Sequence, residues 1–348
     1  MRAFFFCAEP RWGVGGYQHL SIVLAEGFRE LGIEVHSDKD YWEEEPGQYL
    51  FRHDPDVSFE DCDLVFVNSE WHVMGHPWPP NDTEYPTPKK LSGPNRMVFW
   101  LDEMDITVCW DPVFRQFDGV LRAHYNRHMN DLTEHTNIAP WAFGVSNRML
   151  RAAQASPFAE RKRALWSRYR VSHPLRWHMQ EYFYPLLERV LPVDRSTAAG
   201  YGGFADRPGG EWDALMWEQC GSNHHPLYYR QLGGVQACAA FGGLIADENS
   251  HEWQYVDQWD GHRLWESFAA GCATFHVDLE KYGCALPEMP ENWVHYVGVN
   301  LQDLQGTVDR IGEADLEAIG RAGREWALEH YGPEPTARRL LRMIGVGE

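Results

Sequence analysis

The chain has 348 residues, of which 44% are hydrophobic and 24% charged, a composition typical of a soluble globular protein with a substantial core. Its formal net charge of -20 argues against a broad nucleic-acid-binding surface, because neutralising phosphates requires clustered Lys and Arg. No run of 18 apolar residues occurs, so no membrane span is expected, and the short apolar start lacks the features of a signal peptide. Seven cysteines without a CxxC pair fit a reducing compartment, and we expect a cytoplasmic protein.

The first third of the chain alternates strand-like and helix-like segments. The continuous apolar run at 3–8 predicts a strand buried on both faces, and apolar residues at helical spacing predict a helix over 17–32 that ends at Gly32. Further strands are expected at 33–37, 63–69, 96–102 and 119–124. This alternation predicts a doubly wound parallel sheet. Residues 75–95, rich in proline and polar side chains, predict a long loop that borders a site or carries an insertion.

A second unit of the same kind is expected beyond a domain boundary near residue 145. Its clearest part is a strand–helix–strand unit of about 35 residues that ends at residue 277. The Gly-rich stretch 196–213 predicts irregular structure. The expected elements are a strand within 162–170, a helix at 174–191, a strand within 235–248, a helix at 261–270, a strand at 272–277 and helices at 313–331 and 334–345.

The helix at 261–270 is the first place to look for a ligand site, because parallel sheets bind ligands beyond the carboxyl ends of their strands. Asp260 is predicted to cap this helix and Gly271 to end it. Arg263 lies near the positive end of the helix dipole, where a phosphate is stabilised, and Glu266 lies one turn further on. The alternative is an ordinary Arg–Glu pair at i,i+3 on a solvated face. The aromatic residues around the pair favour a site.

The stretch "RLWESFAAGCATFHVD" (263–278) is similar to the donor-binding segment of two-domain nucleotide-sugar glycosyltransferases with the GT-B fold, of the family 4-like and exostosin-like kind. The typical segment has a Glu, seven residues, a second Glu, "A-x-A-x-G" and an apolar strand. Glu266 matches the second glutamate, and the resemblance implies that it binds the ribose hydroxyls. Gln258 stands where the first glutamate would be, and its amide can still bond hydroxyls. "GVGGYQHL" resembles the first loop and helix of such enzymes, with Gly15 and Gly16 letting the backbone approach the ligand.

This resemblance implies an α/β architecture of two Rossmann-like doubly wound domains (GT-B) that face a cleft. We expect an N-terminal acceptor-binding domain at 1–145, a nucleotide-sugar-binding domain at 146–333 and a C-terminal helix at 334–348 that crosses back to the N-terminal domain. The implied activity is glycosyl transfer from a nucleotide-diphosphate sugar, with UDP or GDP as the nucleotide. The acceptor hydroxyl is expected on a glycan or small molecule. We expect a retaining, metal-independent enzyme without a cofactor, because no metal-ligand spacing occurs and GT-B enzymes generally need no metal for donor binding.

Basic and acidic side chains complete the implied site. The candidates for neutralising the diphosphate are Arg168, Arg170, Arg230 and Arg263, each of which can equally be a surface arginine. Only an inverting enzyme needs a protein base to deprotonate the acceptor. The candidates for that base are Asp102 and Glu103, which end a predicted strand, and His19 in the first helix, which is as a lone histidine more often structural.

Two other functions remain open on the sequence alone. A nucleotide-sugar epimerase-type enzyme on the same fold would bind the same donor and carry its acid–base groups differently. A non-catalytic sugar-binding protein would keep the pocket without the transfer chemistry, a reading that Gln258 supports. Neither alternative changes the expected fold.

Overall fold

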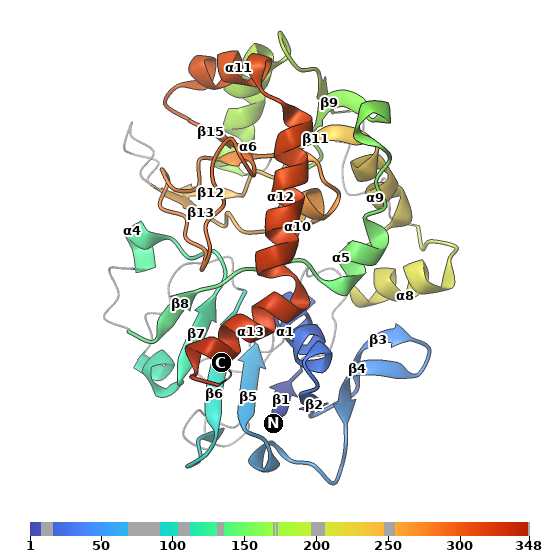
Figure 1. The fold of residues 1–348 in the computed structure, drawn as a ribbon, viewed down its shortest axis with the longest axis vertical. Coiled ribbons are helices and arrows are strands. Elements are labelled where there is room, and N and C mark those ends of the chain that lie inside the picture. The colour runs from blue at the N-terminus through green and yellow to red at the C-terminus, as the bar shows by residue number, and fades with distance from the viewer. Residues whose placement is uncertain are drawn as a thin grey trace.

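The computed structural model shows a mixed α/β chain with two main sheets, one below the other along the long axis (Figure 1). The residues that it describes are 1–7, 17–68, 91–103, 112–130, 136–169, 171, 173–195, 206–246 and 255–346. Within these ranges, no helix is long and apolar enough to cross a membrane. The predicted loop at 75–95 lies mostly outside the described residues.

The first sheet, here the N-terminal sheet, has eight strands in the order β3-β4-β2-β1-β5-β6-β7-β8. The strands are β1 (Arg2–Phe6), β2 (Glu34–Ser37), β3 (Tyr41–Glu45), β4 (Gln48–His53), β5 (Leu64–Asn68), β6 (Met97–Asp102), β7 (Gly119–Arg122) and β8 (Ile138–Pro140). All neighbours pair in parallel except β3 and β4. The predicted buried strands are confirmed. The β3–β4 hairpin was not predicted, because its charged residues hide the period-two pattern of a strand.

The second sheet, here the C-terminal sheet, has five parallel strands in the order β10-β9-β11-β14-β15. They are β10 (Val193–Asp194), β9 (Lys162–Trp166), β11 (Val235–Ala239), β14 (Ala273–Val277) and β15 (Val297–Val299). The predicted strand within 235–248 is interrupted after Ala239, where Gly242 lets the chain pass residue 258: a Cβ there would lie 2.4 Å from the Gln258 carbonyl oxygen. A small antiparallel pair follows, β12 (Leu244–Ala246) with β13 (Tyr255–Asp257).

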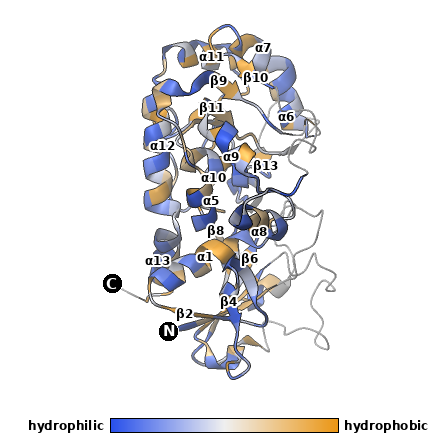
Figure 2. Ribbon diagram, turned by 90° about the vertical axis from the view of Figure 1, so that its right-hand side faces the viewer, coloured by the Kyte–Doolittle hydropathy of each residue, from blue (hydrophilic) through white to orange (hydrophobic). Residues whose placement is uncertain are grey.

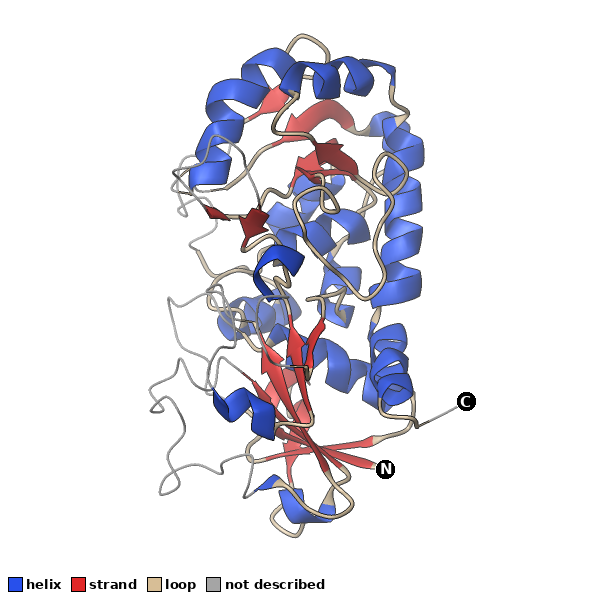
Figure 3. Cartoon of the chain, turned by 90° about the vertical axis from the view of Figure 1, so that its left-hand side faces the viewer, coloured by secondary structure: helices blue, strands red, loops and turns tan. Residues whose placement is uncertain are grey.

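Helices cover both sheets from the outside (Figure 3). The longer ones are α1 (His19–Glu30), α5 (Asn147–Ala152), α8 (Glu211–Gln219), α9 (Pro226–Gly233), α10 (His262–Ala269), α11 (Leu304–Glu313), α12 (Leu316–Tyr331) and α13 (Pro333–Met343). The helix predicted at 174–191 is instead α6 (Pro174–His178), a π-helical turn at Met179–Phe183 and α7 (Tyr184–Leu187). The stretch 196–213, predicted to be irregular, ends inside the first turn of α8, which begins at Glu211.

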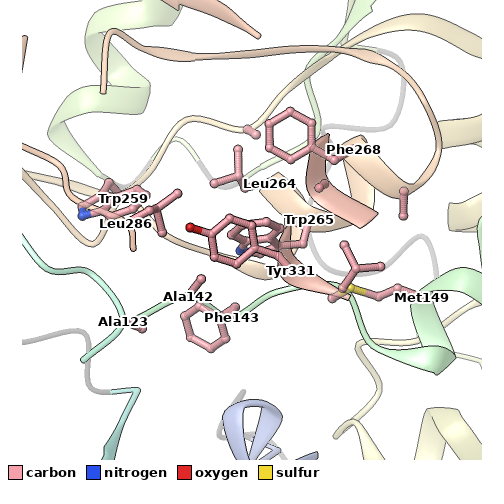
Figure 4. Close-up of a cluster of buried hydrophobic side chains, with 14 of the residues drawn as sticks. Ala123, Ala142, Phe143, Met149, Trp259, Leu264, Trp265, Phe268, Leu286 and Tyr331 are labelled. Carbon is pink, nitrogen blue, oxygen red and sulfur yellow. The ribbon is translucent and has the colours of Figure 1, made fainter. Parts of the chain in front are cut away.

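The chain crosses from one sheet to the other between β8 and α5, and residue 145 lies in this crossing. Figure 4 shows Ala142 and Phe143 of the crossing beside Trp265 of α10 and Tyr331 of α12, so the apolar core continues between the sheets. Along α12, hydrophilic and hydrophobic residues alternate at helical spacing, and its buried side faces the C-terminal sheet (Figure 2). The division into domains at residue 145 stays a prediction.

The last helix, α13, packs against α1 more extensively than any other pair of helices in the described ranges. The close approach depends on Gly27 of α1, where a Cβ would lie 2.0 Å from the Pro333 carbonyl oxygen and 2.8 Å from the Ala337 Cβ. α1 itself ends as predicted at Gly32, whose φ of +73° suits glycine.

We therefore expect Gly27→Ala to lower the free energy of unfolding by about 1–3 kcal/mol or more, because the added methyl group overpacks the α1–α13 contact. The matched control is Gly312→Ala in α11, where the nearest atom, Val190 Cγ1, would be in ordinary contact at 3.5 Å. That variant is expected to gain up to about 1 kcal/mol of helix propensity. Urea unfolding of both variants checks the prediction, and equal stabilities would contradict the tight α1–α13 packing.

Candidate functional site

The carboxyl ends of the two parallel sheets meet at α10, and hydrogen bonds join them. The Asp260 amide donates to His124 Nδ1, just after β7, at 3.1 Å. Trp259 Nε1 donates to the Tyr125 carbonyl at 3.1 Å, and Tyr17 Oη lies 3.4 Å from His262 Nδ1. Ligands of parallel α/β sheets bind at this edge, so the residues around α10 are the candidate site.

The start of α10 differs from the prediction in one respect. Gly261 is the N-cap residue, and Asp260 does not cap the helix. Its carboxylate instead accepts hydrogen bonds from the Phe143 amide at 2.9 Å and from Trp265 Nε1 at 2.6 Å. The predicted cap was wrong because the crossing segment takes the carboxylate. Burial raises the pKa of Asp260 to about 7, although these two hydrogen bonds oppose the shift.

Glu266 is buried, with 6% of its surface exposed, so the alternative of an Arg–Glu pair on a solvated face is wrong. Two tyrosines of α9 donate to its carboxylate, Tyr228 to Oε2 at 2.6 Å and Tyr229 to Oε1 at 2.7 Å. Arg148 Nη2 lies 3.8 Å from Oε1. Each carboxylate oxygen has a second lone pair, which leaves it able to accept another hydrogen bond. Ribose binding by Glu266 stays a prediction.

Arg148 is the main residue of the site that the sequence analysis missed. Its side chain is buried and bonds to Tyr17 Oη, to Tyr229 Oη at 2.5 Å and to His224 Nδ1 at 3.1 Å. Because Tyr17 directly precedes α1 while Tyr229 belongs to α9, Arg148 connects the two halves of the molecule. Its guanidinium also lies 5.1 Å from the centre of the Tyr17 ring. No spacing pattern distinguishes this arginine from others in a six-residue helix.

Two of the predicted arginines come together beside Glu266. The Arg168 guanidinium lies 5.9 Å from the Tyr228 ring centre, and Arg263 lies 5.9 Å from the Tyr169 ring centre. Burial, followed by the positive charge of Arg263, lowers the pKa of Arg168 to about 10. An anion between the two guanidinium groups would relieve this repulsion. Arg230 is exposed on the last turn of α9. Three more candidates, Arg170, Gly15 and Gly16, lie outside the described residues.

Gln258 lies against the loop that follows β11. Its φ of +51° is in the left-handed region, and its carbonyl accepts a hydrogen bond from the Gly243 amide at 3.2 Å. The side chain extends toward the same glycine, where a Cβ would lie 2.7 Å from Gln258 Oε1. The amide therefore lies beside the loop that follows the carboxyl end of β11, and its contact with a sugar stays a prediction.

The three candidates for a catalytic base are all engaged with the protein. Asp102 forms a buried ion pair with Arg122. Glu103 accepts hydrogen bonds from the first two amides of α1, at 3.1 and 3.0 Å, and from Asn68 Nδ2 at 2.6 Å. His19 Nε2 lies 3.1 Å from the Gly144 carbonyl oxygen. Their catalytic role stays a prediction.

Three histidines, buried His19 and His124 and half-buried His262, surround Phe143 where the sheets meet. Ring centres of His19 and His262 are 4.8 Å apart, and Phe143 lies 4.8 Å from His262 and 5.5 Å from His124. Burial lowers the pKa of both His19 and His124 to about 3. Only His19 was predicted as a candidate base; His262 belongs to the helix predicted as the site, and His124 comes from the segment after β7, distant in sequence from both. Within the described ranges, no group of three or more His, Cys, Asp or Glu side chains is arranged to hold a metal ion.

These buried neutral histidines predict loss of stability in acid. Burial also lowers the pKa of a third histidine, His276, to about 4. The ordinary pKa of histidine is about 6.5. Below that pH the histidines of the unfolded chain take up protons, whereas His19, His124 and His276 of the folded protein do not. The stabilisation is complete above about pH 6.5 and is lost as pH falls toward 3–4, by about 2 kcal/mol per histidine at pH 5. Urea unfolding at pH 8 and pH 5 checks this. In His276→Gln the acid loss is expected to shrink by about 2 kcal/mol, and an unchanged slope would contradict the prediction.

We compared the chain with protein families, curated proteins and solved structures, and only solved structures match it. No family model and no curated protein matches the sequence. An alpha-glucosyltransferase in complex with UDP and a 13-mer DNA containing an HMU base aligns with a TM-score of 0.56 at 12% identity, over 99% of both chains. Anabaena Alr3699/HepE in complex with UDP-glucose aligns with a TM-score of 0.51 at 11% identity, over 99% of both chains. A glycosyltransferase from Rickettsia africae ESF-5 aligns with a TM-score of 0.52 at 13% identity, over 98% of this chain and 97% of the other.

At these identities the likeness concerns the fold. The predicted two-sheet α/β architecture is confirmed by both the sheet topology and the alignments, which extend over nearly the whole chain. The assignment to the family 4-like or exostosin-like branch stays a prediction. The chain therefore has the GT-B glycosyltransferase fold, with the carboxyl ends of its two parallel sheets meeting at α10.

Proposed function

We propose that this protein is a glycosyltransferase that moves a sugar from a nucleotide-diphosphate sugar to an acceptor hydroxyl. The observation that carries the proposal is the group formed by Glu266, Arg263, Arg168 and Tyr228 at the start of α10, where the sheets meet. A buried carboxylate is suited to the two ribose hydroxyls, and a helix N-terminus with two arginines is suited to the diphosphate. Two of the three solved structures compared above contain UDP or UDP-glucose, which supports a UDP-sugar donor.

The arrangement favours a retaining reaction without a bound metal. In such a reaction the bond between the anomeric carbon and the diphosphate oxygen breaks, and the acceptor oxygen bonds to that carbon on the same face. The acceptor proton passes to the leaving diphosphate, whose negative charge Arg168 and Arg263 stabilise. No protein base is required, which is consistent with the engagement of Asp102 and Glu103 in structural bonds. An inverting enzyme would need Asp102, Glu103 or His19 as the base.

We assign acceptor binding to an N-terminal domain at 1–145 and donor binding to a domain at 146–333. We assign residues 334–348 to the C-terminal helix that packs back on the N-terminal domain. One solved neighbour was crystallised with DNA, but the net charge of -20 favours an uncharged glycan or small-molecule acceptor here. The described cysteines are free and buried, which supports a reducing compartment such as the cytoplasm.

Turnover of a donor panel tests this function. The protein is incubated with UDP-, GDP- and ADP-sugars, and release of nucleotide and of free sugar is followed by NMR. We expect slow hydrolysis of one donor with release of the sugar in its original anomeric configuration. Binding without turnover would instead indicate a sugar-binding protein. A new sugar stereoisomer still attached to the nucleotide would indicate an epimerase-type enzyme.

A further inference from the structure

A cavity of about 270 Å³ lies between α1, the β3–β4 hairpin, α5 and α8. Two hydrogen bonds fasten α8 to the hairpin: Glu43 N donates to Gln219 Oε1 at 2.6 Å, and Gln219 Nε2 donates to the Glu43 carbonyl at 2.8 Å. Figure 1 shows α8 above the hairpin on the flank of the molecule. The cavity's lining includes Arg148 but not Arg168, Arg263 or Glu266, so it is distinct from the candidate donor site.

The lining combines buried and exposed groups. Glu26 and Trp42 are buried, with 1% and 2% exposure, and Met216 beside them is also buried. Two further lining residues are Glu45, which is exposed on the hairpin, and Trp212 of α8, which is half-buried. The cavity therefore has a buried carboxyl group and two indole rings in its lining.

Of the three glutamates in the lining, Glu26 is buried, Glu44 is half-buried and Glu45 is exposed. Arg29 neutralises Glu44 through two hydrogen bonds of 2.5 and 2.7 Å. The Arg148 guanidinium donates to Tyr229 Oη and lies 3.8 Å from the Glu266 carboxylate. Exposed Arg151 stacks on Trp212, with its guanidinium 4.2 Å from the ring centre. The Glu26 carboxylate accepts one hydrogen bond, from the Asn147 amide at 2.9 Å.

Burial raises the pKa of Glu26 to about 8. Among the groups that face it, Glu44 of β3 and Glu30 of α1 also raise the pKa, whereas the Asn147 amide of α5 and Arg29 of α1 lower it. Arg148 and Arg151 share the cavity wall. At neutral pH the carboxyl group is therefore mostly protonated until a cation approaches it.

We propose that this cavity binds a small molecule carrying a primary ammonium group, which pairs with the Glu26 carboxylate and lies between Trp42 and Trp212. A buried charge is stable when it is paired, and each indole ring has two faces that attract cations, one of which on Trp212 holds the Arg151 guanidinium. The net charge of -20 draws cationic ligands toward the protein. An aminosugar and an aliphatic diamine share this chemistry, and both fit the chemical character of the lining.

Calorimetric titration at pH 7 tests the site, with glucosamine and putrescine as probes and glucose and 1,4-butanediol as their neutral counterparts. We expect one or both amines to bind, the neutral compounds not to bind, and a proton to be released on binding, since the ammonium ion stabilises ionised Glu26. Proton release appears as a dependence of the heat on the ionisation enthalpy of the buffer. Preference for glucosamine identifies a sugar ligand, and preference for putrescine a diamine.

Three variants make the result specific. Glu26→Gln is expected to weaken amine binding at least about tenfold and to abolish proton release. Glu329→Gln, an exposed change on α12, is the matched control and is expected to bind as the wild type does. If Glu26→Gln does not fold, Trp212→Ala, which removes an indole from the cavity wall, is expected to weaken binding as well. Equal binding of neutral and cationic probes, no binding of either amine at millimolar concentration, or unchanged binding in both cavity variants would overturn the proposal.

Discussion

Glu266→Gln is expected to lower kcat/KM for sugar transfer by about 100- to 1,000-fold. The amide has the shape of the carboxylate but lacks its charge, and one of its two ends no longer accepts hydrogen bonds. If the carboxylate holds two ribose hydroxyls, the amide loses one of these hydrogen bonds and the charge assistance of the other, about 3–4 kcal/mol in total, which corresponds to a change of this size. The change also places an NH₂ group opposite Tyr228 or Tyr229, so we expect a loss of about 1–3 kcal/mol in unfolding free energy.

Two controls separate catalysis from folding in this experiment. Glu329→Gln makes the same chemical change on an exposed surface and is expected to leave both activity and stability unchanged. Tyr228→Phe removes one of the two tyrosine hydroxyls that bond to Glu266 without changing the carboxylate. We expect it to reduce the rate less than Glu266→Gln does. A folded Glu266→Gln variant with wild-type kcat/KM would show that the donor does not use this carboxylate.

Arg148→Met is expected to destabilise the protein by about 3–5 kcal/mol, because it removes one partner of a buried ionic network and leaves the others unpaired. Methionine fills the space of the arginine's aliphatic stem, so the packing of that stem is largely kept. The guanidinium serves Tyr17, Tyr229 and His224 at once and lies 3.8 Å from Glu266. Urea unfolding measures the change.

The matched control for Arg148→Met is Arg2→Met, which removes a surface ion pair with Glu34 at 2.9 Å. Both of those side chains are about half exposed, and such pairs contribute about 0–1 kcal/mol. We expect the buried variant to lose several times more free energy than the surface variant. Similar losses in the two variants would show that the Arg148 network does not hold the two halves together.

The strands that could be predicted from the sequence are those whose burial leaves a clear pattern of apolar residues in the sequence itself. The apolar runs of β1, β5 and β6 are buried on both faces, which produces a continuous signal. The hairpin of β3 and β4 gave no such signal, since "YWEEE" carries three consecutive glutamates. Its stability depends on contacts with α8, which lies about 170 residues further along the chain. Helix α8 was not predicted either, because its local helix preference is weak and its contacts with the hairpin come from a distant part of the chain.

The candidate site could likewise be predicted only in part from the sequence. The position of Glu266 and Arg263 in the first turns of α10 followed from helical spacing and from the resemblance. Their partners did not, because Tyr228, Tyr229 and Arg148 come from helices separated in sequence from α10 and from each other. Asp260 shows the opposite case, in which a local pattern predicted a role that the structure does not have. It has the residue type and position of a helix cap, yet the crossing segment and Trp265 compete successfully for its carboxylate.

The most direct test of the central claim is a crystal structure of the protein with UDP bound. We predict that the diphosphate lies at the N-terminus of α10 within hydrogen-bonding distance of Arg263 or Arg168, and that the ribose hydroxyls reach Glu266. A nucleotide bound elsewhere, without contact to α10 or to these side chains, would contradict the account.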